Sequence, residues 1–387
     1  MHLEGLYIHI PFCKSKCNYC DFYSKPVIKD RLCFDIKNYT DALKRHIEKM
    51  APSLQKYNFD TVYFGGGTPS LLGENLSSIY KTIKENLNIS KNCEVTFEAN
   101  PESVNINLAK SAFSEGFNRV SLGLQSAVDG ELKALGRIHT KKDFENAIKI
   151  LKNEGFKNIS ADIMLSIPYQ TIKSLDKTLD YILSLDLQHI SAYGLKIEKN
   201  TPFYNNIESL NICDEETQRE MYLHTVKKLE NTGFYQYEIS NFAKKGFISK
   251  HNYKYWTREN YLGIGPYAYS SLENKRFFMN CDIQKFENEE NIQNVIEIQE
   301  TLSQNDILFE YIMLGLRLKE GLSFKKIKSI LKKVNTNKEK SDKIIKNFID
   351  KCKILQKNNL GFLANDRFYL TPEGFLVSNS IINYLEI

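Results

Sequence analysis

Strand-like and helical segments alternate along the first half of this 387-residue chain. Runs rich in Val, Ile, Tyr and Phe, which are typical of β-strands, occur at residues 6–12, 61–65, 94–99, 119–124, 159–165 and 189–197. Helical spacing of apolar residues follows the first run, where Ile36, Leu43 and Ile47 would share one face, and recurs after the second, fourth and fifth. Repeated strand–helix–strand units build parallel sheets with right-handed crossovers. Six units fall short of a closed eight-stranded barrel, so the pattern predicts an α/β fold, a partial (β/α)6 or three-quarter TIM-like barrel.

The alternation weakens beyond about residue 213. A helix is predicted at residues 214–231 and a strand at 235–240, and the polar stretch 291–305 is expected to be a linker. The remainder combines helical patterns with a predicted strand pair at 362–364 and 367–370, which is typical of a small winged-helix-like domain. We therefore expect three parts: a barrel core at residues 1–210, a barrel extension at 211–300 and a C-terminal domain at 306–387.

The composition limits which cellular compartment and which class of partner we expect for this protein. No apolar run reaches transmembrane length and the N-terminus lacks the apolar core of a signal peptide, so we expect a cytoplasmic protein. The net charge of +5, with basic residues widely spread, argues against a nucleic-acid partner. Five scattered cysteines are expected to be ordinary reduced thiols: Cys33, Cys93, Cys213, Cys281 and Cys352.

Three further cysteines, Cys13, Cys17 and Cys20, follow the first strand-like run with the spacing C-x3-C-x2-C. Three thiolates can hold three irons of a [4Fe–4S] cluster, which leaves the fourth iron open to a small molecule with an amine and a carboxylate. Three alternatives remain open. They are a zinc site completed by a histidine such as His9, a disulfide framework, which is typical of small secreted chains, and a chance cluster of structural thiols.

Glycine and polar residues fall at the ends of successive predicted strands. The turn Gly65-Gly66-Gly67-Thr68-Pro69 ends the second strand, and lacks the lysine pattern of a phosphate-binding loop. The next strands and their loops carry Glu98, Gln125, Arg137 and Asp162. Such barrels place their chemistry at the carboxyl ends of the strands, so these residues predict a small-molecule site on one rim, although each alone could belong to a surface polar network.

These motifs resemble the radical S-adenosylmethionine (SAM) superfamily and, more closely, the oxygen-independent coproporphyrinogen III oxidase family. The resemblance runs from about residue 5 to the C-terminus. It implies that Cys13, Cys17 and Cys20 hold a [4Fe–4S] cluster. It implies SAM contacts from Tyr7, Tyr19, Gly66, Gly67, Thr68, Glu98, Gln125, Arg137 and Asp162. Within this set we expect the two glycines to bind the SAM ammonium, Arg137 its carboxylate, Gln125 and Asp162 its ribose, and Glu98 either the ribose or the ammonium.

The family has two branches, which differ in two places. The oxidases have a fourth cysteine where this chain has Phe22, and a long N-terminal extension where this chain has 12 residues before Cys13. The HemW-type heme chaperone branch carries H-N-x-x-Y-W, which matches residues 251–256 and contains the only Trp of the chain, Trp256. Many relatives have a histidine where this chain has Tyr269. His251 is therefore the expected heme contact.

The resemblance therefore implies a heme chaperone built on a radical SAM fold, with no catalytic residue assigned. The alternative is a coproporphyrinogen III oxidase (dehydrogenase) of anaerobic heme biosynthesis, and cleavage of SAM in turnover is an open question. The implied cofactors are a [4Fe–4S] cluster, SAM and heme. The expected partners are a heme-accepting protein and an electron donor such as flavodoxin or ferredoxin, with a homodimer and peripheral membrane association as further expectations and no nucleic acid.

Overall fold

The computed structural model describes residues 3–334 and 338–386, and its larger part is built on one sheet. The twelve strands run in the order β14-β13-β12-β11-β1-β4-β5-β6-β7-β8-β10-β9. The six predicted strands are all present and adjacent, with every neighbouring pair among them parallel. Their bounds are β1 (Leu3–Ile10), β4 (Asn58–Gly66), β5 (Ile89–Ala99), β6 (Arg119–Gln125), β7 (Ile159–Leu165) and β8 (His189–Gly194).

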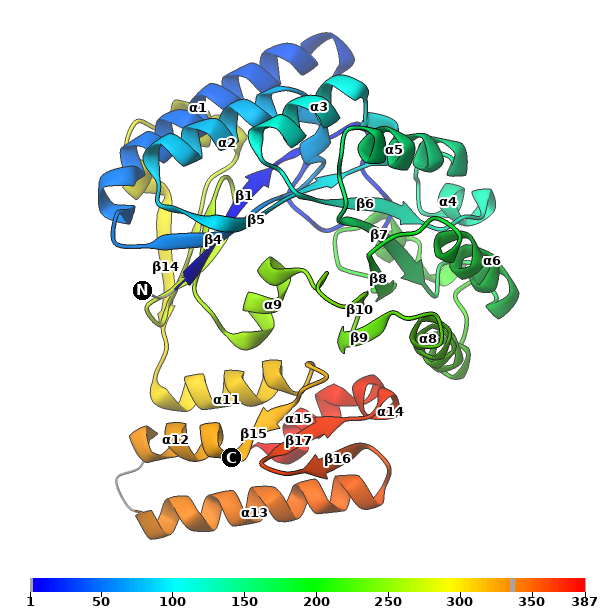
Figure 1. Cartoon of the computed structure of the whole chain (residues 1–387), viewed down its shortest axis with the longest axis vertical. Coiled ribbons are helices and arrows are strands. Elements are labelled where there is room, and N and C mark those ends of the chain that lie inside the picture. Colours follow the sequence, from blue (N-terminus) through cyan, green and yellow to red (C-terminus); the bar gives the residue numbers. More distant parts are fainter. Residues whose placement is uncertain (1–2, 335–337, 387) are drawn as a thin grey trace.

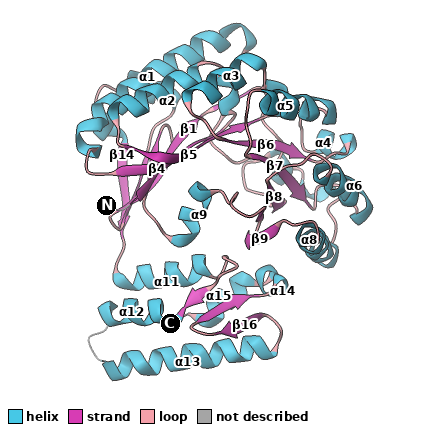
Figure 2. Ribbon diagram, in the orientation of Figure 1, coloured by secondary structure: helices cyan, strands magenta, loops and turns pink. Residues whose placement is uncertain are grey.

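Helices cover the outer face of this curved sheet, as Figure 1 shows. They are α1 (Leu32–Leu54), α2 (Asn75–Asn86), α3 (Ile106–Glu115), α4 (Asp129–Ala134), α5 (Lys141–Asn153), α6 (Ile172–Leu183) and α8 (Glu215–Glu230). The sequence pattern did not single out α3, which buries only Leu108, Ala109 and Ala112. Strands inside and helices outside form an open barrel (Figure 2), so the predicted partial barrel is confirmed.

The sheet extends beyond the six predicted strands on both sides. β11 (Tyr261–Ile264) pairs in parallel with β1, so a strand from late in the chain lies next to the first one. An antiparallel ribbon then continues the sheet through β12 (Tyr269–Leu272), β13 (Lys275–Met279) and β14 (Ile296–Thr301). The opposite edge is formed by β10 (Asn241–Ala243) and β9 (Tyr235–Glu238). Short elements complete this part: β2 (Phe12–Cys13), β3 (Lys25–Pro26), α7 (Pro202–Asn205), α9 (Lys250–Thr257) and α10 (Ile283–Asn288).

The expectation that residues 291–305 form a linker is wrong. This stretch contains a short 3-10 helix, Ile292–Val295, and the edge strand β14. Ile292 and Val295 are buried in the barrel core. Five of the six residues of β14 are exposed, because an edge strand has a neighbour on one side only. Its polar sequence therefore resembled a linker.

The C-terminal domain has its own core, formed by residues that include Leu316, Phe348 and Phe368. Its helices are α11 (Gln304–Gly315), α12 (Phe324–Val334), α13 (Lys338–Lys357), α14 (Pro372–Leu376) and α15 (Ser378–Leu385). Its three-stranded sheet has the order β15 (Leu322–Ser323), β17 (Arg367–Leu370), β16 (Gly361–Ala364). The predicted strand pair is β16 and β17, which are antiparallel. Within the described residues, no helix has the length and apolar character to cross a membrane.

Helix α9 lies between the barrel sheet and the C-terminal domain (Figure 1). Its end is joined to α11 by an ion pair in which Arg258 Nε lies 2.6 Å from Glu310 Oε2. The Tyr253 hydroxyl donates to Glu320 Oε1 at 2.9 Å. The backbone N–H of Ile239 also donates to the carbonyl of Arg317 at 2.9 Å. These contacts fix the position of the C-terminal domain against the barrel.

Candidate cofactor site

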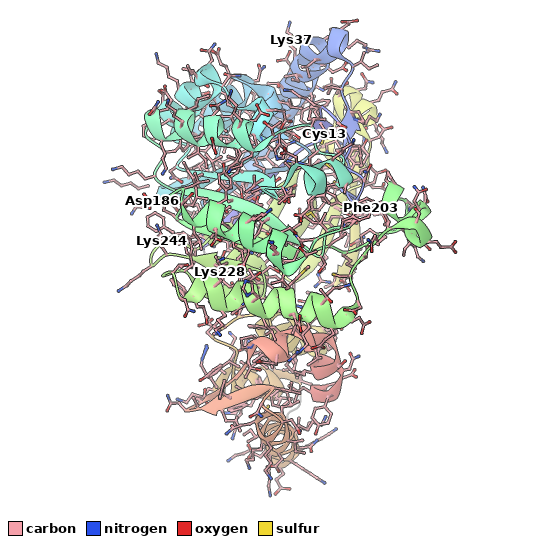
Figure 3. The ribbon with its side chains drawn as sticks, turned by 90° about the vertical axis from the view of Figure 1, so that its right-hand side faces the viewer. Cys13, Lys37, Asp186, Phe203, Lys228 and Lys244 are labelled. Atoms are coloured by element: carbon pink, nitrogen blue, oxygen red, sulfur yellow. The ribbon has the colours of Figure 1, made fainter. Side chains whose placement is uncertain are left out.

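The three cysteines lie on the segment that follows β1, at the carboxyl-end rim of the barrel. Cys13 ends the short strand β2, and Cys17 and Cys20 lie on the loop after it. Figure 3 shows Cys13 and Phe203 toward one side of the molecule and Asp186, which precedes β8, toward the other. The loop is anchored to the rim by the Asn18 side chain, which donates to the carbonyl of Ala134 at 3.0 Å, and by the Phe203 N–H, which donates to the carbonyl of Asn18 at 2.9 Å. The rim location agrees with the expectation from barrel topology.

The three thiols are close enough to influence one another. Burial raises the pKa of the Cys20 thiol to about 11, and the neighbouring Cys17 and Cys13 sulfurs add to the rise. Thr68 Oγ1 lies 3.6 Å from Cys13 Sγ, and Arg137 Nη1 lies 3.5 Å from Cys17 Sγ. Donors beside sulfur stabilise the thiolate form, and a bound cation removes the mutual repulsion of thiolates. This donor set therefore fits an iron–sulfur cluster.

The geometry argues against two of the three alternatives, a disulfide framework and a zinc site completed by His9. All eight cysteines are free thiols. Both ring nitrogens of His9 are engaged, Nδ1 with the Tyr7 hydroxyl at 3.1 Å and Nε2 with the carbonyl of Tyr23 at 2.9 Å. In residues 3–334 and 338–386, no three His, Cys, Asp or Glu side chains converge on a single metal position. A zinc site completed by His9 therefore does not fit.

The glycine turn packs directly on the start of the cysteine loop. The Gly67 N–H donates to the carbonyl of Ile10 and the Thr68 N–H to the carbonyl of Phe12, both at 2.7 Å. A Cβ atom on Gly67 would lie 2.5 Å from the Phe12 carbonyl oxygen. Gly66 has a φ of +110°, a conformation that favours glycine. The two most specific motifs of the sequence are therefore neighbours in space.

Glu98, at the end of β5, faces the glycine turn. Its carboxylate accepts hydrogen bonds from the Tyr63 hydroxyl at 2.8 Å and from the Gly66 N–H at 3.2 Å. Burial, with a smaller contribution from the nearby Asp162, raises the Glu98 pKa to about 7. A cationic ligand group would therefore be needed to hold this carboxylate fully ionised at neutral pH.

A hydrogen-bonded chain connects the glycine turn to the cysteine loop through Arg137. Asn100 Nδ2 donates to Thr68 Oγ1 at 3.1 Å, and Arg137 Nη2 donates to Asn100 Oδ1 at 2.7 Å. The same nitrogen donates to the carbonyl of Gly123 at 2.9 Å. The sequence analysis did not select Asn100. It lies directly after Glu98-Ala99 and before Pro101, at the end of a predicted strand, which is the same kind of position that indicated Glu98 and Gln125.

The other predicted rim residues lie near these groups. Gln125 ends β6 with a φ of +66°, a left-handed conformation that is unusual outside glycine. Asp162 accepts hydrogen bonds from Ser121 Oγ at 2.9 and 3.0 Å, and burial raises its pKa. Burial also raises the pKa values of Tyr7 and Tyr19. A Cβ atom on Gly123 would lie 3.0 Å from Gln125 Nε2 and 3.1 Å from Arg137 Nη2. Asp162 and Tyr7 interact electrostatically with Glu98, and Tyr19 with Cys17, so the predicted rim residues are neighbours.

His251 lies inside the barrel on α9 and is only 1% exposed. Its Nδ1 is hydrogen-bonded to Thr61 Oγ1 and its Nε2 to the Tyr255 hydroxyl, both at 2.8 Å. Its ring stacks on Tyr63, with centroids 5.1 Å apart, and burial lowers its pKa to about 3. In this conformation no ring nitrogen is free to bind iron, so a heme contact through His251 requires one of these hydrogen bonds to break.

The position of α9 depends on a residue that the sequence did not indicate. The backbone N–H groups of Lys250 and His251 donate to the Glu94 carboxylate at 3.2 and 3.1 Å. A carboxylate at a helix N-terminus satisfies otherwise unpaired N–H groups. Glu94 on β5 therefore holds the start of α9 inside the barrel, and His251 in turn supports Tyr63, the partner of Glu98.

Comparison with known proteins agrees with this geometry. The family model of the radical SAM superfamily matches residues 7–182, and that of the HemN C-terminal domain matches residues 302–377. The chain is 33% identical to the heme chaperone HemW of Buchnera aphidicola subsp. Schizaphis graminum, over 98% of this chain and 97% of that protein. The chain belongs to the HemW family of radical SAM proteins. Membership of the superfamily implies a [4Fe–4S] cluster and SAM as cofactors.

Further relatives support the same assignment. The chain is 36% identical to HemW of Bacillus subtilis, over 71% of this chain and 72% of that protein. Among solved structures, coproporphyrinogen III oxidase (HemN) from Escherichia coli superposes with a TM-score of 0.82 and covers all of this chain and 90% of that one. At 19% identity this likeness shows the shared fold alone. The predicted family and fold are thus confirmed.

Proposed function

We propose that this protein is a heme chaperone, which binds heme and delivers it to an acceptor protein, on a radical SAM scaffold that keeps its cluster and SAM sites. The observation that carries the proposal is that relatives named heme chaperones match this chain along almost its whole length. Two local features support it. Phe22, rather than a fourth cysteine, follows the triplet, and residues 251–256 carry the H-N-x-x-Y-W pattern.

In this proposal Cys13, Cys17 and Cys20 ligate the cluster, and the other rim residues bind SAM. A reduced cluster bound there would supply the electron that reductive cleavage of SAM requires. Thr68 and Arg137 donate toward two of the cysteine sulfurs, and such second donors orient ligands and tune their charge.

Three groups of rim residues are suited to different parts of SAM. The glycine turn and the Glu98 carboxylate suit its ammonium, because Glu98 forms no ion pair with a basic side chain of the described residues. Arg137 suits its carboxylate by charge. Because Nη2 donates to Asn100 and Gly123 and Nη1 lies against Cys17 Sγ, a carboxylate must use the second Nη1 hydrogen or replace one of these bonds. Asp162 and Gln125 suit the ribose hydroxyls, while Tyr7 and Tyr19 add aromatic contact.

The heme contact at His251 stays a prediction, and the structure indicates how to test it. Two variants should act in opposite directions if Nε2 binds iron after leaving Tyr255. His251→Ala should weaken heme binding, and Tyr255→Phe should strengthen it because the competing hydroxyl is gone. Equal heme affinity in wild type and both variants would exclude His251 as a ligand.

The decisive experiment is anaerobic reconstitution of the full chain with iron, sulfide and SAM, followed by titration with heme. We expect a shift of the heme absorption band, transfer of the heme to an apo-heme protein, and no protoporphyrinogen from coproporphyrinogen III. Formation of that product would favour the oxidase instead, and absence of heme binding would exclude the chaperone.

An electron donor such as flavodoxin or ferredoxin, a homodimer and peripheral membrane association remain predictions. Reduction of the reconstituted cluster by each donor, the molar mass in solution and co-sedimentation with lipid vesicles test them separately.

A further inference from the structure

A pocket of about 240 Å³ lies where α9 of the barrel meets the C-terminal domain. Its wall combines the C-terminal end of α9 with α11, β15, α12 and β17, and Figure 1 shows these elements gathered below the open side of the barrel. Neither the cluster loop nor the SAM rim contributes to it. Five of its lining residues have aromatic or charged side chains that can contact a ligand: Trp256, Tyr311, Glu320, Lys326 and Arg367.

Helix α9 presents different residues to its two sides. Residues four apart share a helix face, and His251 and Tyr255 face the barrel interior, where they are hydrogen-bonded to each other. Tyr253 and Trp256 lie on the other side, where Tyr253 bonds to Glu320 of the C-terminal domain and Trp256 lines the pocket. Trp256 makes no side-chain hydrogen bond with the described residues, so its indole is available to a ligand.

The pocket has an excess of positive charge. Glu320, its only acidic lining residue, already accepts from the Tyr253 hydroxyl at 2.9 Å and lies 3.6 Å from Arg367 Nη1. The ammonium group of Lys326 has no hydrogen-bonding or ion-pair partner among residues 3–334 and 338–386, and it is exposed at the pocket. Arg367 uses only Nη1, which also donates to the carbonyl of Glu320 at 3.2 Å. Two cations with unused donors are therefore directed at the pocket.

The pocket lining also includes a neutral donor, Tyr311. The Tyr311 hydroxyl accepts a hydrogen bond from the Ser323 N–H at 3.0 Å, so its own hydrogen is left for a ligand. An arginine, a lysine and a phenol together suit a carboxylate, and an indole suits a flat apolar ring. The ligand that this lining fits is a planar aromatic molecule with a carboxylate at its edge.

We propose that the pocket receives the carboxylate-bearing edge of heme, with one propionate between Lys326 and Arg367 and the porphyrin plane along Trp256. This inference rests on the proposed function. The pocket lies on the side of α9 opposite His251, so heme bound here is held without the predicted His251 contact. Pockets that enclose a ligand of this size are usually about 300–1,000 Å³, so a cavity of about 240 Å³ takes only the edge. The rest of the ring stays outside, where an acceptor protein can reach it.

The test compares two ligands and two charge reversals in the full-length protein. Lys326→Glu changes an exposed side chain whose ammonium has no hydrogen-bonding or ion-pair partner among the described residues, so it should leave the fold intact. Lys333→Glu is the matched control, because Lys333 is an exposed lysine of the same helix outside the pocket. Each protein is titrated with heme and with heme dimethyl ester, in which both carboxylates are blocked, and binding is followed by heme absorption and by quenching of Trp256 fluorescence.

We expect Lys326→Glu to weaken heme binding at least tenfold, Lys333→Glu to change it less than twofold, and neither to alter the weaker binding of the dimethyl ester. Equal loss in both variants, or equal affinity of the wild type for the two ligands, overturns the pocket as the propionate site. Heme binding by the wild type that Lys326→Glu leaves unchanged overturns the pocket alone. No heme binding by the wild type overturns the chaperone function itself.

Discussion

Gly67 links the glycine turn to the cysteine loop, and replacing it with alanine should disturb both. The new Cβ would lie 2.5 Å from the Phe12 carbonyl oxygen, 2.9 Å from the Ile10 carbonyl oxygen and 2.9 Å from the Phe12 nitrogen. All three are backbone atoms of the segment that leads into Cys13, so no side-chain rotation relieves the contact. Gly67 is not among the glycines with positive φ, so the effect would be steric and not conformational.

The size of the effect follows from these distances. Ordinary contacts of a Cβ begin at 3.4 Å, so the 2.5 Å contact requires a shift of about 0.9 Å. Forcing a methyl group into a packed site costs roughly 1–3 kcal/mol. The shift also strains the hydrogen bonds of Gly67 and Thr68 to the same segment, each worth about 1 kcal/mol. We expect Gly67→Ala to lower the free energy of unfolding by about 2–4 kcal/mol and to move Cys13 away from its cluster position.

Two measurements check this expectation. Urea unfolding of the apoprotein gives the change in stability, and iron and sulfide per chain after anaerobic reconstitution give the effect on the cluster. Gly130→Ala in α4 is the control, because a Cβ there meets no atom within 4 Å. An unfolding midpoint and iron content in Gly67→Ala equal to those of the wild type would refute the steric reasoning.

Three further perturbations test the site. Because burial raises the Glu98 pKa to about 7, wild-type affinity for SAM should rise between pH 6 and 7.5, and calorimetric titration of Glu98→Gln should show a smaller rise. Arg137→Lys cannot keep the paired bonds of Nη2 to Asn100 and Gly123, so SAM affinity should fall at least about tenfold with an unchanged circular dichroism spectrum. The folded-state pKa of His251 is about 3, below its ordinary value of 6.5, so its contribution to stability is complete above pH 6.5 and is lost as the pH falls toward 3. Each pH unit in that window costs about 1.4 kcal/mol per such histidine, and urea unfolding of His251→Gln at pH 6.5 and 5.5 should show a shallower loss than the wild type.

Much of the barrel could be predicted from the chain because its signals are local. The period of apolar residues distinguishes strands from helices. The cysteine motif and the glycine motif are each contained in a short stretch, with five or fewer residues between successive cysteines or glycines. β7 occupies the predicted residues, and the predicted strand pair of the C-terminal domain is β16 and β17. The edge strand β14 was missed because its exposed residues carry no burial pattern.

The sequence by itself determined the partial barrel, the cysteine triplet and the glycine turn, since each is written in a short stretch of residues. Only the tertiary structure decided which distant residues meet. It placed β11 beside β1, buried His251 against Thr61 and Tyr63, and joined Trp256 to Lys326 and Arg367 across two domains. Those contacts depend on sheet order and on the docking of α9, which are set by the packing of the whole chain and leave no periodicity in the sequence near any one residue.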